Sequence, residues 1–409
     1  MNANCYKIIF SKRLGTLVAV GEHTSSTGKA ASGQGCRGSV VVDGFVGALR
    51  FTFASVAIAC LSLGNTQAQS TLALASTALP QGGSVNTGSA TISTHGAAMA
   101  ITQTTDKASI NWQSFNVGTA ASVNIAQPST DAVLLNRVVG NDPSQILGKL
   151  TANGQVILLN PNGVVFGKDG SVTASSFTAS TFGLTDADFM AGYYKYTRNG
   201  STAAVVNQGT IETSAGGFVA LIGASVTNDG KIIAPQGNVV LAAAESVTLP
   251  DAVTATQSSP ASTVSVPLSK KVRLELLPAT INTAITNTPS GVIVTDGGQV
   301  LLQAAAISTA VASITHSGSI DTSGNQGGAV QVLAENGNIK VKGSITANST
   351  GSDNNNQPLK GGDIIIGRDE QTGALAKATD VSGARLESNK GFVETSGQHL
   401  DSLGVNVKA

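Results

Sequence analysis

The stretch that decides the fold is Asn136–Gly167, which reads NRVVGNDPSQILGKLTANGQVILLNPNGVVFG. Within it, the tetrapeptide Asn-Pro-Asn-Gly at 160–163 separates two apolar runs, Val156–Leu159 and Val164–Phe166. Its proline fixes φ for one turn position, and its glycine adopts a positive φ without a steric penalty. The pattern therefore predicts two β-strands joined by a tight turn.

The composition of the whole chain points the same way. Its 409 residues include 47 glycines, with 41% hydrophobic, 12% charged and only 4% aromatic residues. Charge is too sparse for the surfaces of many helices, and the apolar content is too high for disorder, so a turn-rich β fold is favoured. The formal net charge is zero. No basic stripe with interleaved aromatic residues occurs, so no nucleic-acid partner is expected.

Two motifs in the deciding stretch resemble a known family. Asn136-Arg137-Val138, followed by Gly140 and Ser144-Gln145-Ile146, and then the Asn-Pro-Asn-Gly turn, are similar to the two-partner-secretion domain of filamentous-haemagglutinin-like exoproteins. The resemblance implies a β-helix that an outer-membrane β-barrel transporter engages through periplasmic recognition domains. It also implies a secretion motif made of Asn136, Arg137, Val138, Asn160, Pro161, Asn162 and Gly163. Whether these residues touch the transporter or only support folding is left open.

The N-terminus reads as two successive export signals. Residues 1–35 resemble the extended signal-peptide region of very large exported proteins. A conventional signal peptide follows, with Arg50 as its charge and Phe51–Leu63 as its apolar core. Cleavage is expected between Ala68 and Gln69, so the general secretory machinery and signal peptidase are expected partners. The apolar core is short for a membrane span.

Cysteine use agrees with export. Cys5, Cys36 and Cys60 are the three cysteines of the chain, and all precede the expected cleavage site. Disulfides would be allowed in the periplasm, but they would close loops in a chain that must cross a second membrane unfolded. Their absence from the mature part is consistent with outer-membrane translocation and also with any cysteine-free β-repeat protein.

Glycine-led repeats predict the architecture. In one set of copies, residues two and four positions after the glycine are Val, Leu or Ile; the glycines include Gly217, Gly237, Gly298, Gly328 and Gly362. A second set has isoleucine two positions after its glycine: Gly209, Gly230, Gly291, Gly318 and Gly343. Such units bury their apolar face only by stacking. They predict an all-β, right-handed parallel β-helix of about fifteen coils, with an N-terminal cap and small accessory hairpins.

Details of this solenoid follow from individual residues. Trp112 and Phe115 are expected to close the cap. Asn207 and Asn228, each two residues before a repeat glycine, are expected to form a side-chain ladder. Two insertions, 185–200 and 251–279, interrupt the coils. The first carries Tyr193, Tyr194, Tyr196 and Arg198, an exposed-looking patch for which covering the solenoid is favoured over contact with a receptor or glycan.

No catalytic, cofactor or metal site is predicted. His95, His316 and His399 lie far apart, without carboxylates or cysteines at ligand spacing. Asp229, Asp296, Asp321 and Asp363 fall beside glycines, where carboxylates commonly cap turns. The prediction is therefore a protein that is not an enzyme, although β-helices also include polysaccharide-degrading enzymes.

The expected organisation has four parts: 1–35, the extended signal region; 36–68, the signal peptide; 69–285, the secretion β-helix; and 286–409, the start of an adhesin passenger. The expected function is export through the periplasm to the cell surface or medium, with an adhesin or haemagglutinin passenger presented to a host-cell receptor or glycan. Haem acquisition, delivery of a toxin or cytolysin, and polysaccharide degradation remain alternatives.

Overall fold

The computed structural model describes residues 6–11, 16–21, 74–249, 274–369 and 373–409. The chain divides into two units, 1–69 and 70–409. In the first, β1 (Tyr6–Ser11) and β2 (Thr16–Gly21) form an antiparallel pair. The expected signal-peptide core and the cleavage residues Ala68 and Gln69 lie outside the described residues. Within the described ranges, no helix is long and apolar enough to span a membrane.

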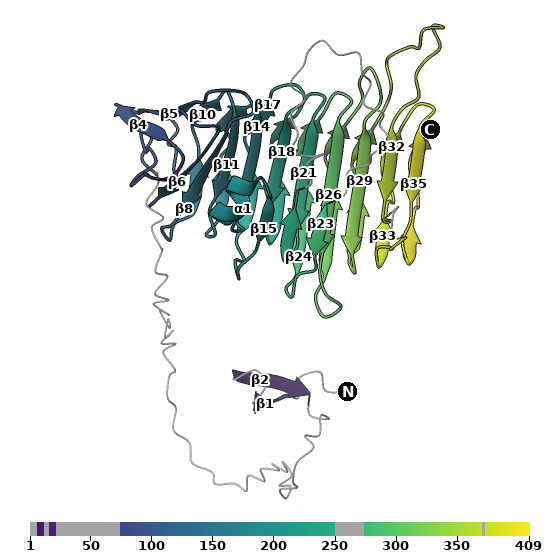
Figure 1. The fold of residues 1–409 in the computed structure, drawn as a ribbon. Helices are drawn as coiled ribbons and strands as arrows, with labels where there is room; N and C mark the ends of the chain where they lie inside the picture. The colour runs from purple at the N-terminus through teal and green to yellow at the C-terminus, as the bar shows by residue number, and fades with distance from the viewer. Residues whose placement is uncertain (1–5, 12–15, 22–73, 250–273, 370–372) are drawn as a thin grey trace, which may run out of the picture. The chain divides into compact units, whose positions relative to one another are not determined.

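The second unit is built on three long sheets whose strands stack along one axis (Figure 1). The first sheet has 12 strands. In chain order they are β4 (Ala90–His95), β5 (Ala98–Gln103), β7 (Ser122–Ala126), β10 (Lys149–Ala152), β13 (Ser171–Ala174), β17 (Thr210–Thr213), β20 (Lys231–Ile233), β25 (Val292–Val294), β28 (Ser319–Asp321), β31 (Ser344–Thr346), β34 (Arg385–Glu387) and β37 (Asn406–Lys408).

The second and third sheets have 11 and 9 strands. The second holds β3 (Ser84–Thr87), β6 (Lys107–Trp112), β8 (Val133–Val138), β11 (Gln155–Leu159), β14 (Ser176–Ser180), β18 (Phe218–Ile222), β21 (Asn238–Ala243), β26 (Gln299–Ala305), β29 (Ala329–Glu335), β32 (Asp363–Ile366) and β35 (Phe392–Thr395). The third holds β9 (Ser144–Ile146), β12 (Val164–Phe166), β16 (Ala204–Asn207), β19 (Ser225–Asn228), β24 (Thr283–Asn287), β27 (Ala312–His316), β30 (Asn338–Val341), β33 (Ala378–Asp380) and β36 (His399–Asp401).

The parallel β-helix is confirmed. Neighbouring strands in these sheets pair in parallel, except for β3 with β6 and β4 with β5, which are antiparallel at the N-terminal cap. The estimate of about fifteen coils was too high, because the longest of the three sheets has 12 strands. Some residues add no coil, because they belong to the cap hairpin, to the insertions or to the long turn around 351–361.

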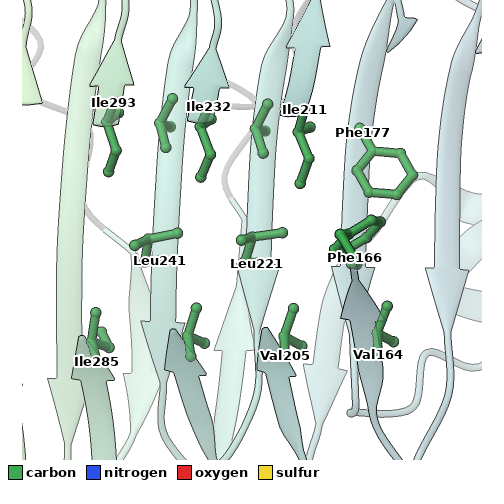
Figure 2. Packing of buried hydrophobic residues seen from close by; sticks show 14 of the residues in the cluster. Val164, Phe166, Phe177, Val205, Ile211, Leu221, Ile232, Leu241, Ile285 and Ile293 are labelled. Carbon is green, nitrogen blue, oxygen red and sulfur yellow. The ribbon is translucent and has the colours of Figure 1, made fainter. Parts of the chain in front are cut away.

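The interior consists of columns of similar side chains (Figure 2). Val205 pairs with Val226, and the column continues through Ile285 and Ile314. Ile211, Ile232 and Ile293 form a parallel column on the first sheet. These side chains are at most 1% exposed, and burying each stabilises the fold by about 1.5–3 kcal/mol. The repeated apolar positions of the sequence are therefore the residues that face the interior of each coil.

The repeat glycines form columns for a steric reason. A Cβ at Gly237 would collide with the carbonyl oxygen of Gly217, and a Cβ at Gly298 would collide with that of Gly237. The corners of successive coils thus approach more closely than any side chain allows. This contact explains why glycine precedes most strands of the second sheet from β11 onward.

Trp112 and Phe115 pack in the first coils as predicted. Their rings meet edge to face with centroids 5.5 Å apart, and both side chains are 1% exposed. Beyond its area burial, such a pair contributes about 0.5–1.5 kcal/mol.

The outer face of the second sheet is covered by an accessory layer. Its members are α1 (Asp186–Ala191) and an antiparallel sheet of β15 (Lys195–Thr197), β22 (Ser246–Thr248) and β23 (Glu275–Leu277). They enclose a second core with outward-facing residues of β8 to β26, including Leu135, Ile157 and Val240. Figure 1 shows this layer in front of the stacked strands. Accessory strands were expected, but the short helix was not.

The structure corrects the interpretation of the tyrosine insertion as exposed. Tyr196 is 1% exposed and Arg198 is 8% exposed, whereas Tyr193 is 48% exposed. Tyr196 packs in the second core, where burial, with a smaller contribution from the Tyr194 charge, raises the pKa of its phenol. The preferred reading, that the insertion covers the solenoid, is confirmed. Of the second insertion, residues 274–279 are described and include β23.

The predicted asparagine ladder is present and longer than expected. The Asn207 amide donates to the Asn228 side-chain oxygen, and Asn228 donates to Asn287, both at 2.8 Å. Asn287 Nδ2 lies 3.0 Å from His316 Nδ1, and His316 Nε2 lies 3.1 Å from the Ser344 carbonyl oxygen. All four ladder side chains are fully buried. Burial lowers the pKa of His316 to about 4, so the ring is neutral at pH 7 and accepts through Nδ1.

Candidate secretion site

The Asn-Pro-Asn-Gly segment forms a corner between two sheets. The strands on either side of it, β11 and β12, belong to the second and third sheets and do not pair with each other. The Gly163 N–H donates to the Asn160 carbonyl at 3.1 Å, and Gly163 has φ +124. The Asn162 N–H donates to Asn160 Oδ1 at 2.9 Å. The predicted turn is confirmed, but it changes the direction of the coil and does not close a hairpin.

Asn160 also joins this corner to the preceding coil. Its fully buried side chain donates to the Asp142 carbonyl at 2.9 Å and to Ser144 Oγ at 3.0 Å. The Asn162 amide donates to the Gly140 carbonyl at 2.8 Å. The segment after Asn136-Arg137-Val138 is therefore the same corner one coil earlier. We call the two stacked turns, residues 139–143 and 160–163, the motif corner.

The first motif is part of β8. Asn136 is fully buried; its Oδ1 accepts from the Trp112 indole N–H at 3.0 Å, and its amide lies 3.5 Å from the Ile157 carbonyl. Val138 is 2% exposed. Asn136 therefore satisfies the polar atom of the cap tryptophan, which would otherwise be buried without a partner.

Arg137 points outward and ties β8 to α1. Its guanidinium donates to the Leu184 carbonyl at 2.7 Å and forms an ion pair with Asp186 at 3.0 Å. At the other end of the helix, Lys107 Nζ donates to the carbonyls of Phe189 and Met190, both at 3.0 Å. Partial burial lowers the pKa of Lys107. Asp186 in the first turn and Lys107 at the last turn carry the charges that the helix dipole favours, and Arg137 reaches the first turn through its ion pair with Asp186.

A cavity of about 420 Å³ opens beside the motif corner. We call it the motif cavity. Its lining includes Arg137, Val138, Pro161, Phe182, Arg198 and Ser201. Ser201 Oγ donates to the Pro161 carbonyl at 2.8 Å, and Arg198 Nε pairs with Glu245 Oε2 at 2.9 Å. The cavity therefore brings together both motifs and the end of the tyrosine insertion.

The predicted motif residues thus divide by orientation. Asn136, Val138 and Asn160 are buried inside the fold, whereas Arg137 and Pro161 reach the surface at the motif cavity. Sequence reasoning missed Asp186 and the earlier corner at 139–143, and it placed Arg198 in an exposed patch, whereas Arg198 is 8% exposed beside the motifs. Ser144 and Val164 pair across the two coils, so they lie one coil apart in the sequence. That spacing is the signal that could have revealed the earlier corner.

The described residues contain no group of three or more His, Cys, Asp or Glu side chains that could hold a metal. Among the carboxylates expected at turns, Asp321 accepts from the Ser323 N–H at 2.9 Å, and Asp229 accepts from Thr288. The Asp321 contact caps a turn as predicted, whereas the Asp229 contact joins two neighbouring coils.

Fold and motif corner together define a parallel β-solenoid whose first coils hold the signature motifs. The profile of the TPS secretion domain matches residues 76–280, and that of the Extended Signal Peptide of Type V secretion system matches residues 1–50. The chain belongs to the TPS secretion domain family. Membership implies export by the general secretory route and an outer-membrane transporter as partner, in a family whose exoproteins are typically not enzymes.

Relatives and solved structures agree on this family. A heme/hemopexin-binding protein of Haemophilus influenzae strain Rd is 39% identical over 168 residues, which cover 40% of this chain and 19% of the relative. A second such protein from Haemophilus influenzae is 40% identical over 111 residues, covering 27% and 12%. The crystal structure of the HMW1 secretion domain from Haemophilus influenzae matches with 25% identity and a TM-score of 0.60, covering 81% of this chain and 98% of that one. The chain spans less than a fifth of the length of either relative.

Proposed function

We propose that this chain is the exported partner of a two-partner-secretion pair, released to the cell surface or medium after cleavage between Ala68 and Gln69. The observation that carries the proposal is the motif corner, because Asn160 and Asn162 bond there to the turn that directly follows the first motif, one coil earlier. Residues 69–285 form the export domain in this scheme. Residues 286–409 begin the passenger in this scheme and continue the same three sheets, which end in β35, β36 and β37. The end of the family match at residue 280 supports a boundary near 285.

Secretion with and without the transporter tests the proposal. Asn160→Ala and Asn136→Ala are expected to lower release by roughly tenfold or more when the transporter is co-expressed, a factor that corresponds to about 1.4 kcal/mol. Asn160→Ala loses its bonds to the earlier corner, and Asn136→Ala leaves the Trp112 N–H without an acceptor.

The matched control is Asn207→Ala, which removes an equally buried asparagine from the ladder outside the motifs. We expect it to lose stability while release stays near that of the unsubstituted chain. Normal release of both motif variants would contradict a role for the motifs in secretion. An equal loss in all three would reduce that role to stability.

For the passenger we propose an adhesin or haemagglutinin activity without enzymatic turnover. Agglutination of red cells and binding to host-cell receptors or glycans are the measurements. Release of sugars from pectin or a glycosaminoglycan by the purified protein would overturn the non-enzymatic assignment. Lysis of target cells would instead identify a toxin or cytolysin passenger.

A second candidate is haem acquisition, which the names of the two relatives favour. In this case, the full protein would bind haem or hemopexin through its passenger. Capture of purified hemopexin by the secreted protein, without agglutination, would select this function over adhesion. The reverse pattern would select adhesion.

A further inference from the structure

We propose that the open edge of β4 is a self-association surface, at which two copies of this chain pair their β4 strands antiparallel and join their first sheets into one. This self-association is separate from the proposed export function and does not depend on it. β4 is the outermost strand of the first sheet, at the N-terminal end of the stack (Figure 1).

The three long sheets end differently at this N-terminal end. The third sheet is covered, because the Val117 N–H donates to the Gln145 carbonyl of β9 at 2.9 Å, and residues 76–78 accept hydrogen bonds from the segment that follows. The second sheet ends in β3, whose pairing with β6 is interrupted by a register shift between Val85 and Thr87. Such a bulge blunts an edge against pairing with another chain. Among the described residues, the first sheet alone ends here in a strand with neither protection.

The edge strand itself is regular and uncharged. β4 pairs with β5 without interruption, from Ala90 opposite Gln103 to His95 opposite Ala98. In the part of the chain that the structure describes, residues 90–95 form no backbone hydrogen bond outside this hairpin. The strand reads ATISTH, so it contains no Lys, Arg, Asp, Glu, Pro or Gly. Its outer N–H and C=O groups are therefore a template for a further strand, without the charges or proline that commonly prevent such pairing.

A second copy fits this edge because the edge is complementary to itself. Ala90 and Ile92 are partly buried against the core, whereas Thr91 and Ser93 are exposed on the outer face. A two-fold axis perpendicular to the sheet keeps the inner faces of both copies on the same side and sets Ile92 opposite Ile92 of the other copy. Thr91 then lies opposite Ser93 at two symmetric positions. No like charges meet, and hydroxyl pairs of this kind stabilise neighbouring strands.

The size of the edge sets the strength of the association. Its six residues are few beside the roughly 20–30 residues per side of a stable interface. The pairing therefore gives a weak, reversible dimer whose population rises with protein concentration.

Charge placement tests the pairing and its register. Thr91→Lys combined with Ser93→Lys sets like charges opposite each other across the two-fold axis, which opposes pairing. Thr91→Lys combined with Ser93→Glu sets opposite charges at the same two positions and should restore it. The matched control is Thr173→Lys, because Thr173 is exposed on the outer face of β13, inside the same sheet.

Sedimentation of the purified protein over a range of concentrations is the measurement. We expect the mass of the unsubstituted chain and of Thr173→Lys to rise from one copy toward two. The paired lysine variant should need a concentration at least about tenfold higher for the same rise, and the lysine–glutamate variant should dimerise again. Circular dichroism on the same samples checks that every variant is folded.

A mass of one copy for the unsubstituted chain at every concentration would overturn the proposal, and so would a dimer that survives the paired lysines. If the paired lysines weaken binding to the transporter and leave the mass unchanged, the edge belongs to the transporter and the proposal is again wrong. These masses are measured on purified protein, whereas failure of the proposed export function appears as loss of release from cells. The two failures are therefore distinguishable.

Discussion

The second sheet has two regions that share an inward face and differ in their outward face. From β8 to β26, outward residues such as Leu135, Ile157 and Leu301 pack under the accessory layer. From β29 to β35, the outward positions lie outside that second core and include the polar Gln331 and Glu394 together with the buried Leu333 and Ile365. The inward-facing apolar residues therefore form the solenoid core along the whole sheet, whereas the residues that pack under the accessory layer occur only in the region that carries the secretion motifs.

Two phenylalanines provide the test with the largest expected difference between the two regions. Phe218 and Phe392 each precede a valine of the same inward column, but Phe218 is 5% exposed in the second core and Phe392 is 47% exposed. We expect Phe218→Ala to lower the free energy of unfolding by about 3–5 kcal/mol. Phe392→Ala should cost about 1 kcal/mol or less. Urea unfolding measures both, and equal losses would show that the accessory layer does not distinguish the regions.

The asparagine ladder lies on the third sheet and ends on His316 of β27, the third-sheet strand that follows β26, so pH probes the end of the first region. Because the folded-state pKa of about 4 lies below the ordinary 6.5, the neutral ring stabilises the fold above pH 6.5. That stability is lost as pH falls from 6.5 to 4, by about 3 kcal/mol in total. His316→Asn extends the ladder without a titrating group and should flatten this decline. Thermal unfolding from pH 4 to 7 is the measurement, and parallel curves for the two proteins would refute it.

The smallest expected effect lies at the edge of the accessory layer. Gln303, 1% exposed on β26, donates to Gln331 of β29 at 2.7 Å. Gln331→Ala leaves that amide without this acceptor and should cost about 1 kcal/mol. The double variant Gln303→Leu with Gln331→Ala should recover part of the loss, because it removes the buried polar group as well. A double-mutant cycle in urea checks this, and strict additivity would contradict the coupling.

The fold was predictable because each coil repeats the same short pattern of glycine and apolar residues in the sequence. Glycine followed by Val, Leu or Ile at two and four positions predicts an inward face, and that prediction requires no knowledge of which coil lies beside which. Asn207 and Asn228 were likewise predicted as partners because they occupy matching positions of adjacent units. Asn287 and His316 were missed, since the second insertion breaks the spacing before the former and the latter changes residue type.

The candidate site was only half predictable for the same reason. The motif residues could be named from a resemblance, but Asn160 meets Asp142 and Ser144 through the register of stacked coils, which local sequence does not encode. The strand of Asn136 also follows Ala132, where other copies carry glycine, so it did not align with the repeat. The helix of six residues is too short to produce a periodic signal, and Tyr196 looked exposed because its burial depends on strands distant in sequence.

The accessory layer also sets an order of assembly. It begins with α1 and is completed only by β23, whose last residue is Leu277, three residues before the family match ends at 280. A chain emerging from its N-terminus would expose the outward side chains of β8 and β11 until that strand arrives. The shortest chain that can bury this apolar face therefore ends with β23. That point lies close to the end of the family match at residue 280.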